Sequence, residues 1–156
     1  MHPDFHATRP GGPIEASIRK LDLADRLVID LGYGRGDLAA LTLAAGAGCV
    51  YGIEIDEHPE PTDPRIVVHR VDLTQVMVLP NDACVVMAPP YSLIAHVFAM
   101  TAFYENVWSL CPTGALDLAA SYELHEVGCV DGDAFDPPST GKHHIVVRGP
   151  FARGLL

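Results

Sequence analysis

A strand-like apolar run followed by closely spaced glycines constrains the fold of this chain more than any other feature. The run is Leu27–Leu31, and it is typical of a central strand that is buried on both faces. The glycines follow at alternate positions, as Gly32, Gly34 and Gly36. Without a Cβ, a glycine lets the backbone turn sharply and come close to a ligand. We therefore expect a strand, a tight ligand-binding loop, and a helix that is capped by Asp37 and ends near residue 45.

Strand-like and helix-like segments continue to alternate along the chain. A helix is predicted over residues 14–23, and further strands are predicted over Cys49–Ile53 and Ile66–His69. Three prolines lie between these two strands and exclude a helix from the connection. The next elements are predicted as a strand over residues 83–87, a long helix over residues 92–110 and a strand over residues 115–120.

The last third of the chain predicts a closing hairpin. Residues 127–130 and 144–147 are strand-like and are joined by a polar loop. Together with the preceding alternation, the hairpin predicts an α/β fold: a Rossmann-like doubly wound, mostly parallel sheet with an antiparallel edge hairpin, in a compact single domain. We place this domain at residues 13–156. Residues 1–12 are rich in histidine, proline and glycine, and are predicted to be a flexible N-terminal arm.

Composition narrows the classes of partner. The 20 acidic residues outnumber the 10 basic ones and give a formal net charge of -10, so direct nucleic-acid binding by this chain alone is not expected. The four cysteines form no Cys-x-x-Cys pair and are predicted to be reduced thiols. No apolar run has the length of a membrane span, and the N-terminus lacks the apolar core of a signal peptide. We expect a cytoplasmic protein without membrane contact.

The spacing of the glycines separates two classes of cofactor. Dinucleotide enzymes carry G-x-G-x-x-G and place a pyrophosphate at the helix N-terminus, whereas this loop has the spacing G-x-G-x-G. Asp30 precedes the loop, and its carboxylate would match a ligand with an ammonium group. The segment from Asp30 to Gly36 resembles the first motif of the class I S-adenosylmethionine (SAM)-dependent methyltransferases. The resemblance covers roughly residues 26–120 and implies that SAM is held by Asp30, Gly32, Tyr33, Gly34 and Gly36.

Two further acids fit the same resemblance. The second motif of the family is an acid at the end of the second strand, which binds the ribose hydroxyls, and Glu54 followed by Ile55 stands at this place. Glu54 lies 22 positions after Gly32, near the offset of about 20 residues that is typical of a ribose-binding acid. Asp72, after the third strand, matches the acid that meets the adenine amino group. A Rossmann-like crossover without a ligand is the alternative, and an NAD enzyme is a more distant one.

The predicted fourth strand ends in Met87-Ala88-Pro89-Pro90-Tyr91-Ser92, at the place where this fold family presents the methyl group. The segment resembles the Asn/Asp-Pro-Pro-Tyr signature of amino-group methyltransferases that act on nucleobases or protein glutamine. The resemblance implies that the carbonyls of Ala88 and Pro89 accept hydrogen bonds from the target amine, while Tyr91 stacks on a planar substrate. Ala88 departs from the signature because it has no side-chain acceptor.

Two functions follow and stay open at this point. The first is a SAM-dependent methyltransferase that acts on an amino group of a planar substrate, either a nucleobase or an amide. The second is a non-catalytic SAM-binding subunit that regulates or stabilises a partner. The intact cofactor motifs favour the enzyme, whereas Ala88 and the negative charge favour the non-catalytic subunit.

The remaining polar and aromatic residues are predicted to be structural. His143 and His144 are interpreted as a surface pair, and no metal site is predicted. Solvated loop acids are predicted at Asp131, Asp133 and Asp136, and core aromatics at Phe98, Phe103 and Trp108. The crossovers after the second and fifth strands are predicted to be short, which would leave part of the sheet uncovered. A homodimer or a partner subunit is therefore expected.

Overall fold

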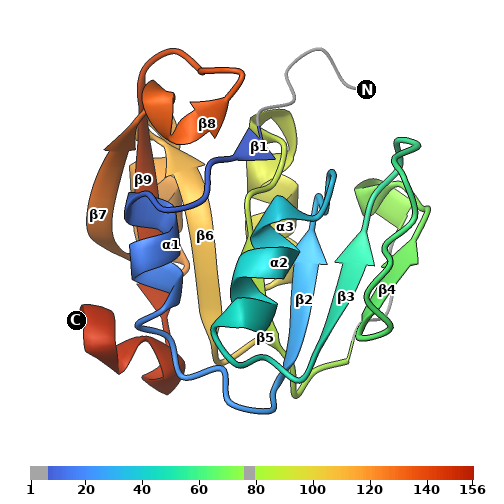
Figure 1. The fold of residues 1–156 in the computed structure, drawn as a ribbon. Coiled ribbons are helices and arrows are strands. Elements are labelled where there is room, and N and C mark those ends of the chain that lie inside the picture. The colour runs from blue at the N-terminus through green and yellow to red at the C-terminus, as the bar shows by residue number, and fades with distance from the viewer. Residues whose placement is uncertain (1–6, 76–79) are drawn as a thin grey trace.

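A computed structural model describes residues 7–75 and 80–156 of the chain (Figure 1). Within these residues, seven strands form the main sheet in the order β4-β3-β2-β5-β6-β9-β7. Their bounds are β2 Leu27–Leu31, β3 Cys49–Ile53, β4 Ile66–His69, β5 Cys84–Met87, β6 Val107–Pro112, β7 His125–Asp131 and β9 Lys142–Arg148. Strand β9 runs antiparallel to β6 and β7, and the other pairs are parallel. The predicted doubly wound, mostly parallel sheet with a closing antiparallel hairpin is confirmed.

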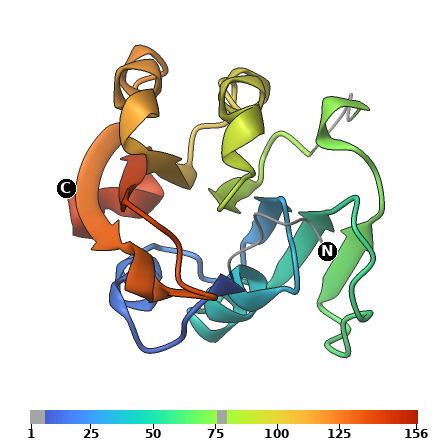
Figure 2. The same cartoon turned by 90° about the horizontal axis from the view of Figure 1, so that it is seen from above.

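Helices cover both faces of the sheet, as the view from above shows (Figure 2). Helices α1 (Pro13–Ile18) and α2 (Asp37–Ala44) lie on one face, and α3 (Ile94–Met100) and α4 (Leu116–Ser121) lie on the other. The short 3-10 helices are η1 Leu73–Gln75, η2 Tyr91–Leu93, η3 Thr113–Ala115, η4 Gly132–Ala134 and η5 Pro150–Leu155. Because the central strand β5 is covered on both faces, all four of its residues are buried.

The carboxyl ends of the parallel strands meet at one edge of the sheet, and this edge positions the candidate site. Strand β2 pairs with β3 up to Leu31 and Ile53, so the segments that follow these two residues leave the sheet side by side. Strand β5 pairs with the other side of β2, and its continuation emerges at the same edge. The strand order reverses between β2 and β5. In open α/β sheets, ligands bind at such a reversal point.

The prediction of one long helix over residues 92–110 is wrong. Helix α3 ends at Met100, and β6 begins at Val107. Val107 and Trp108 are fully buried and pair with β5 on one side and β9 on the other. A short apolar run suits either a helix or a buried strand, and here the two neighbouring strands decide between them. The next segment shifts accordingly: the strand predicted at residues 115–120 is replaced by η3 and α4.

The aromatic residues of this region divide in the same way. Phe98 and Trp108 are confirmed as core residues, with exposed fractions of 1% and 0%. The indole Nε1 of Trp108 donates a hydrogen bond of 2.9 Å to Oγ of Ser17 on α1. Phe103 is not a core residue, because it lies in the turn between α3 and β6 and is 93% exposed.

The connections between strands confirm one predicted short crossover and contradict the other. Residues 54–65, all of which the structure describes, contain no helix, as the prolines predict. The crossover after the fifth strand, β6, does carry a helix, because η3 and α4 follow it directly. In the connection from β4 to β5, the described residues form only the single turn η1. The sheet is therefore covered more thinly at its β3–β4 end than at its β6–β7 end (Figure 2).

The first described residues are attached to a late part of the chain. Strand β1 (Ala7–Thr8) pairs antiparallel with β8 (Phe135–Asp136), near the edge of the sheet that carries the candidate site (Figure 1). Arg9 continues this contact, because its backbone N–H donates to Ala134 O and its Nε donates to Phe135 O. Residues 1–6 of the predicted arm lie outside the described residues. Within the described residues, no helix is long and apolar enough to cross a membrane.

Candidate cofactor and acceptor site

The glycine loop requires the backbone freedom that its composition predicts. Gly32, Gly34 and Gly36 have φ angles of +85°, +59° and +87°, in the left-handed region that side chains disfavour. The N–H groups of Gly32 and Tyr33 both donate to Ile53 O at 3.0 Å, which folds the loop back onto the end of β3. The predicted N-cap is wrong by one residue. Gly36 is the N-cap of α2, and Asp37 is its first residue, 3.6 Å from Nε of Arg35.

Tyr33 is packed beneath the loop. Its side chain is buried, and its ring occupies the space above Gly52 of β3. A Cβ on Gly52 would lie 2.6 Å from the Tyr33 ring, and a Cβ on Gly36 would lie 2.2 Å from the Tyr33 hydroxyl. These two glycines therefore form the space for one aromatic ring. A glycine inside a central strand often marks such a close approach, so Gly52 could have been found from the sequence.

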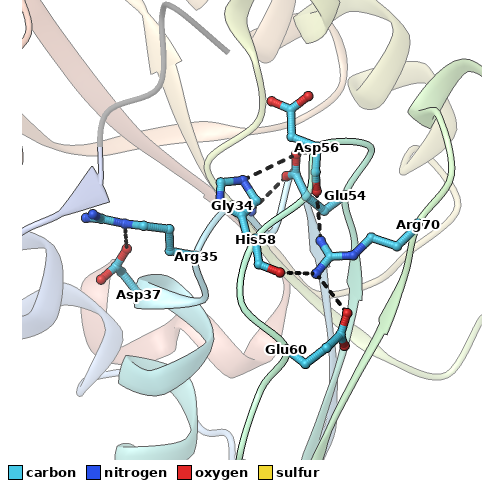
Figure 3. A network of polar contacts seen from close by, with 8 residues as sticks. All are labelled: Gly34, Arg35, Asp37, Glu54, Asp56, His58, Glu60 and Arg70. Carbon is cyan, nitrogen blue, oxygen red and sulfur yellow. Dashed lines mark hydrogen bonds and ion pairs between the residues drawn. The ribbon is translucent and has the colours of Figure 1, made fainter. Parts of the chain in front are cut away.

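Glu54 joins the first two motifs. Its Oε2 accepts a hydrogen bond of 2.8 Å from the N–H of Gly34, and its Oε1 accepts one of 3.2 Å from the N–H of Asp56 (Figure 3). The side chain of Glu54 is 12% exposed. Its position at the end of β3, beside the glycine loop, is the one that the resemblance implies for a residue binding ribose hydroxyls.

Arg70 holds the proline-rich connection that follows Glu54, and no motif indicates this residue in the sequence. Its guanidinium donates to the carbonyl oxygens of Asp56 and His58 at 2.9 and 3.1 Å, and to Oε1 of Glu60 at 3.4 Å (Figure 3). A helix would satisfy its own backbone groups, whereas an extended connection needs partners from elsewhere. Arg70 supplies two of these partners, and so keeps the loop against the end of β4.

Glu54, Asp56 and His58 also bring their possible ligand atoms within 4.8 Å of one another. The Nε2 of His58 lies 4.0 Å from Oε1 of Glu54. Both carboxylate oxygens of Glu54 accept backbone hydrogen bonds, so Glu54 links the glycine loop to the connection that follows β3.

A cleft of about 170 Å³ opens between these motifs. Its lining residues are Gly32, Ile53, Glu54, Ile55, Asp72, Leu73, Pro90, Ser92 and Leu93. Four of the predicted cofactor residues, Gly32, Glu54, Ile55 and Asp72, thus meet at one cleft. Ile55 is 61% exposed beside it. Hydrogen bonds from the N–H and hydroxyl of Thr74 to Oδ1 of Asp72 lower the pKa of this acid, which keeps it ionised.

The acceptor motif packs directly on the glycine loop. A Cβ on Gly32 would lie 3.1 Å from Cδ of Pro90, 3.4 Å from Cα of Pro89 and 3.6 Å from the carbonyl oxygen of Ala88. Any side chain at position 32 would therefore press against the turn after β5. Ala88 is half-buried and Pro89 is buried, so this turn is a fixed wall of the site. The structure brings the predicted cofactor and acceptor motifs into contact.

Tyr91 is held by a residue that the sequence interpretation places on the surface. Its hydroxyl lies 2.6 Å from Nδ1 of His143. The interpretation of His143 and His144 as a surface pair is wrong, since each is only 8% exposed. His144 contacts Oε1 of Glu126 at 2.7 Å and Oγ1 of Thr113 at 2.8 Å. The two histidines lie in β9 between Lys142 and the apolar residues that follow, and their place in that strand is the signal that predicts burial.

Solved structures with the same arrangement identify the fold. No family model matches the chain, and no curated protein sequence matches it. The 23S rRNA methyltransferase ErmE superposes with a TM-score of 0.75 at 20% identity, over 92% of this chain and 70% of its own. A dimethyladenosine transferase from Plasmodium falciparum gives a TM-score of 0.73 at 16% identity, over 93% of this chain and 63% of its own. The chain has the class I methyltransferase fold.

A third similar structure shows how broad this fold is. The ribosomal protein L11 methylase from Lactobacillus delbrueckii subsp. bulgaricus superposes with a TM-score of 0.61 at 13% identity, over 88% of this chain and 77% of its own. The names of these three proteins give an rRNA, a dimethyladenosine and a ribosomal protein as what is methylated. The class I methyltransferase fold therefore occurs in proteins that act on different methyl acceptors.

Asp30 is the most unusual group in this methyltransferase fold. It is 1% exposed, and among the described residues neither carboxylate oxygen has a hydrogen-bond partner. Burial, with a smaller contribution from the charge of Glu54, raises the pKa of Asp30 to about 8. Asp30 is the register partner of Gly52, so it lies beside the buried Tyr33 ring. A buried carboxylate without a partner is costly, and a ligand cation would compensate the cost.

A larger hollow of about 590 Å³ lies at the opposite edge of the sheet and is not part of this site. Its lining residues are Glu105, Glu123, His125, Arg148, Gly149, Pro150, Arg153 and Leu156. Arg148 already donates to the carbonyl oxygens of Thr101, Tyr104 and Tyr122. The smaller cleft is the better candidate, because it is the one where the predicted motifs and the strand reversal point coincide.

Proposed function

We propose that this chain binds SAM in the cleft beside the glycine loop and transfers its methyl group to an amino group of a planar substrate, a nucleobase or an amide. The observation that carries this proposal is the contact between the glycine loop and the turn after β5. Gly32 lies so close to Ala88, Pro89 and Pro90 that a cofactor bound at the loop would meet an acceptor bound at the turn.

The residues around the cleft fit SAM group by group. Asp30 offers a buried carboxyl group without a hydrogen-bond partner among the described residues, and the ammonium of the methionine moiety would favour its ionised form. Glu54 follows β3 directly, beside the loop, and offers acceptors for the ribose hydroxyls. Exposed Ile55 offers an apolar surface for the adenine ring, and ionised Asp72 offers an acceptor for its amino group. When bound, SAM supplies a methyl group on a sulfonium that is already activated for transfer.

The acceptor side works by positioning. The carbonyls of Ala88 and Pro89 accept hydrogen bonds from the amine, and the Tyr91 ring stacks on the planar group that carries it. Ala88 leaves the amine without a side-chain acceptor. A donor or acceptor that acts in the transition state is worth about 10² in rate, so we expect a slow enzyme on generic substrates.

A homodimer or a partner subunit belongs to the same proposal. The net charge of -10 repels a phosphate backbone, so an RNA or DNA acceptor would need help from another chain. Val67 on the edge strand β4 is 52% exposed and Val71 is 39% exposed, which is consistent with a covered surface at the thin end of the sheet. Light scattering coupled to gel filtration would test this directly, and a strictly monomeric protein would contradict the homodimer.

The test of the function separates the cofactor from the reaction. Isothermal titration with SAM comes first, and absence of binding at millimolar SAM would overturn the whole proposal. Transfer of label from methyl-tritiated SAM is then measured on three separate pools: total RNA, denatured DNA and total protein. Binding without transfer, both in the native chain and in Ala88→Asn, would identify the non-catalytic SAM-binding subunit instead.

A further inference from the structure

Three side chains from distant parts of the sequence form a hydrogen-bonded chain at the acceptor side. The Tyr91 hydroxyl lies 2.6 Å from Nδ1 of His143, and Nε2 of His143 lies 2.5 Å from Oγ of Ser139. Tyr91 is 52 positions away from His143 in the sequence. We call these residues the Tyr91–His143–Ser139 chain. It connects the predicted stacking residue to the loop between β8 and β9.

The direction of these hydrogen bonds follows from the chemistry of the phenol. Burial raises the pKa of Tyr91 above its ordinary value, so the hydroxyl keeps its proton and can donate it. With a neutral imidazole, Nδ1 accepts from Tyr91, and the proton on Nε2 is donated to Ser139. In this arrangement each ring nitrogen of His143 has one defined role, and the imidazole is held at both ends.

Packing holds His143 from the sides as well. The Phe135 ring lies with its centroid 4.5 Å from that of His143, and the Tyr91 centroid lies 5.5 Å away. Ser139 is placed by its own backbone, because its N–H donates to Gly132 O at 3.0 Å. A Cβ on Gly132 would lie 1.7 Å from the carbonyl oxygen of Ser139, so this loop closes only over a glycine. The loop therefore brings Ser139 to a fixed position.

We propose that His143 is a positioning residue of the acceptor site, which fixes the Tyr91 ring on which the planar substrate stacks. The inference rests on the proposed function and extends it to a residue outside the acceptor motif. Since Ala88 provides no side-chain acceptor, the orientation of the substrate depends on two backbone carbonyls and on the Tyr91 plane. If the Tyr91 ring rotated freely, the amine of the stacked substrate would be misplaced, and a small misplacement lowers the rate of group transfer strongly.

The neighbouring His144 provides a matched control. It lies on the same strand, is buried to the same extent, and contacts two polar side chains, Glu126 and Thr113. Because successive side chains of a strand point to opposite faces, His144 does not share the surroundings of His143. A general loss of stability in β9 should follow from changes at either histidine, whereas a loss of Tyr91 positioning should follow only from changes at His143.

Two amide variants that differ by one methylene group, His143→Asn and His143→Gln, test the geometry. Asparagine places an amide oxygen near the position of Nδ1 and can still accept from Tyr91, whereas glutamine places its amide near Nε2 and cannot. With tyrosine labelled at Cζ, NMR should show the Tyr91 resonance, assigned with Tyr91→Phe, unchanged in His143→Asn and His144→Gln. It should be shifted and motionally averaged in His143→Gln. An unshifted Tyr91 resonance in His143→Gln would overturn the inference, with or without activity.

The kinetic readout uses adenosine, an uncharged planar amine without a phosphate backbone, as the acceptor probe. We expect His143→Gln to lower kcat/KM for this probe by about fivefold to tenfold, the worth of one ordinary hydrogen bond, with the KM for SAM unchanged. His143→Asn should recover most of the loss. An equal loss in His144→Gln would assign the effect to strand stability and overturn the inference. If the native chain neither binds SAM nor methylates any pool, the proposed function fails, while the NMR comparison still decides whether His143 holds Tyr91.

Discussion

The cofactor side and the acceptor side of the site are held together by different kinds of contact. On the cofactor side, the glycine loop, Glu54 and Asp72 come from consecutive segments, and most contacts run to backbone groups, such as Gly34 N–H to Glu54 and Gly32 N–H to Ile53. On the acceptor side, the contacts join side chains that are far apart in the chain, as in Tyr91 with His143. The contacts of the cofactor side therefore correspond to a local sequence pattern, whereas the side-chain contacts of the acceptor side do not.

This contrast predicts how the two sides respond to mutation. The cofactor side depends on close backbone packing, so it should tolerate almost no added side-chain volume and should lose SAM binding when the packing is disturbed. The acceptor side depends on side-chain hydrogen bonds, so each substitution that removes one of these bonds should lower activity by a smaller amount. Four substitutions test this contrast.

The largest effect is expected from Asp30→Asn, as a change in the pH dependence of stability. The pKa of Asp30 is about 8 in the folded chain and about 3.8 when the chain is unfolded, so folding takes up a proton. Its contribution to stability is therefore complete below about pH 3.8 and is lost as the pH rises through 8. The free energy of unfolding of the native chain should therefore fall by about 3 kcal/mol between pH 5 and pH 7 relative to that of the variant. The substitution also adds a difference that is the same at every pH.

Urea unfolding at pH 5, 6 and 7 measures this difference. Parallel stability curves for the native chain and Asp30→Asn would show that Asp30 is ionised in the folded state, and that a partner for it exists in solution.

The next effect is expected from Gly52→Ala. The new Cβ would lie 2.6 Å from the Tyr33 ring, so either the strand or the glycine loop has to move. We expect a loss of about 2 kcal/mol in the free energy of unfolding and a loss of SAM binding in isothermal titration. In the double variant Gly52→Ala/Tyr33→Ala the ring is absent, and the closest remaining contact of the new Cβ with residue 33 is the one of 3.0 Å to its Cβ. The Gly52 change should then cost much less than in the native background, and additive costs would contradict the packing argument.

On the acceptor side, a gain is expected from Ala88→Asn. The asparagine would restore the side-chain acceptor of the motif, and we expect the rate of methyl transfer to rise by about tenfold. The rise is smaller than the effect of a sole acceptor, because the backbone carbonyls of the native chain already accept hydrogen bonds from the amine. Initial rates with methyl-tritiated SAM on the best acceptor pool measure the change. Ala88→Leu, of similar bulk but without polar atoms, is the control, and an equal rise in this variant would contradict the role of the acceptor.

The smallest effect is expected from Phe103→Ser, outside both sides. Since Phe103 is 93% exposed in the turn after α3, its replacement should change the free energy of unfolding by less than about 0.5 kcal/mol. SAM affinity should not change. A large loss of stability in urea unfolding would mean that Phe103 packs against another chain or another part of this one.

The comparison also shows which parts of the molecule were predictable. The bounds of β2, β3 and β4 agree with the predicted strands, because each is a short apolar run bounded by glycine, proline or charged residues. The proline-rich connection after Glu54 agrees because proline excludes a helix whatever surrounds it. Strand β6 was not predictable, since its residues fit a helix as well as a strand until β5 and β9 are placed beside them.

Local features of the chain could be predicted from its sequence: where the backbone must turn, where it cannot form a helix, and which acids follow the strands that carry the cofactor motifs. These features depend on the chemistry of neighbouring residues, so they are readable without a structure. Only the tertiary structure decided what Tyr91, His143 and Ser139 do together, and that Asp30 is buried without a partner among the described residues. Both depend on segments that meet only when the chain has folded, because burial and side-chain contact are properties of the packed fold.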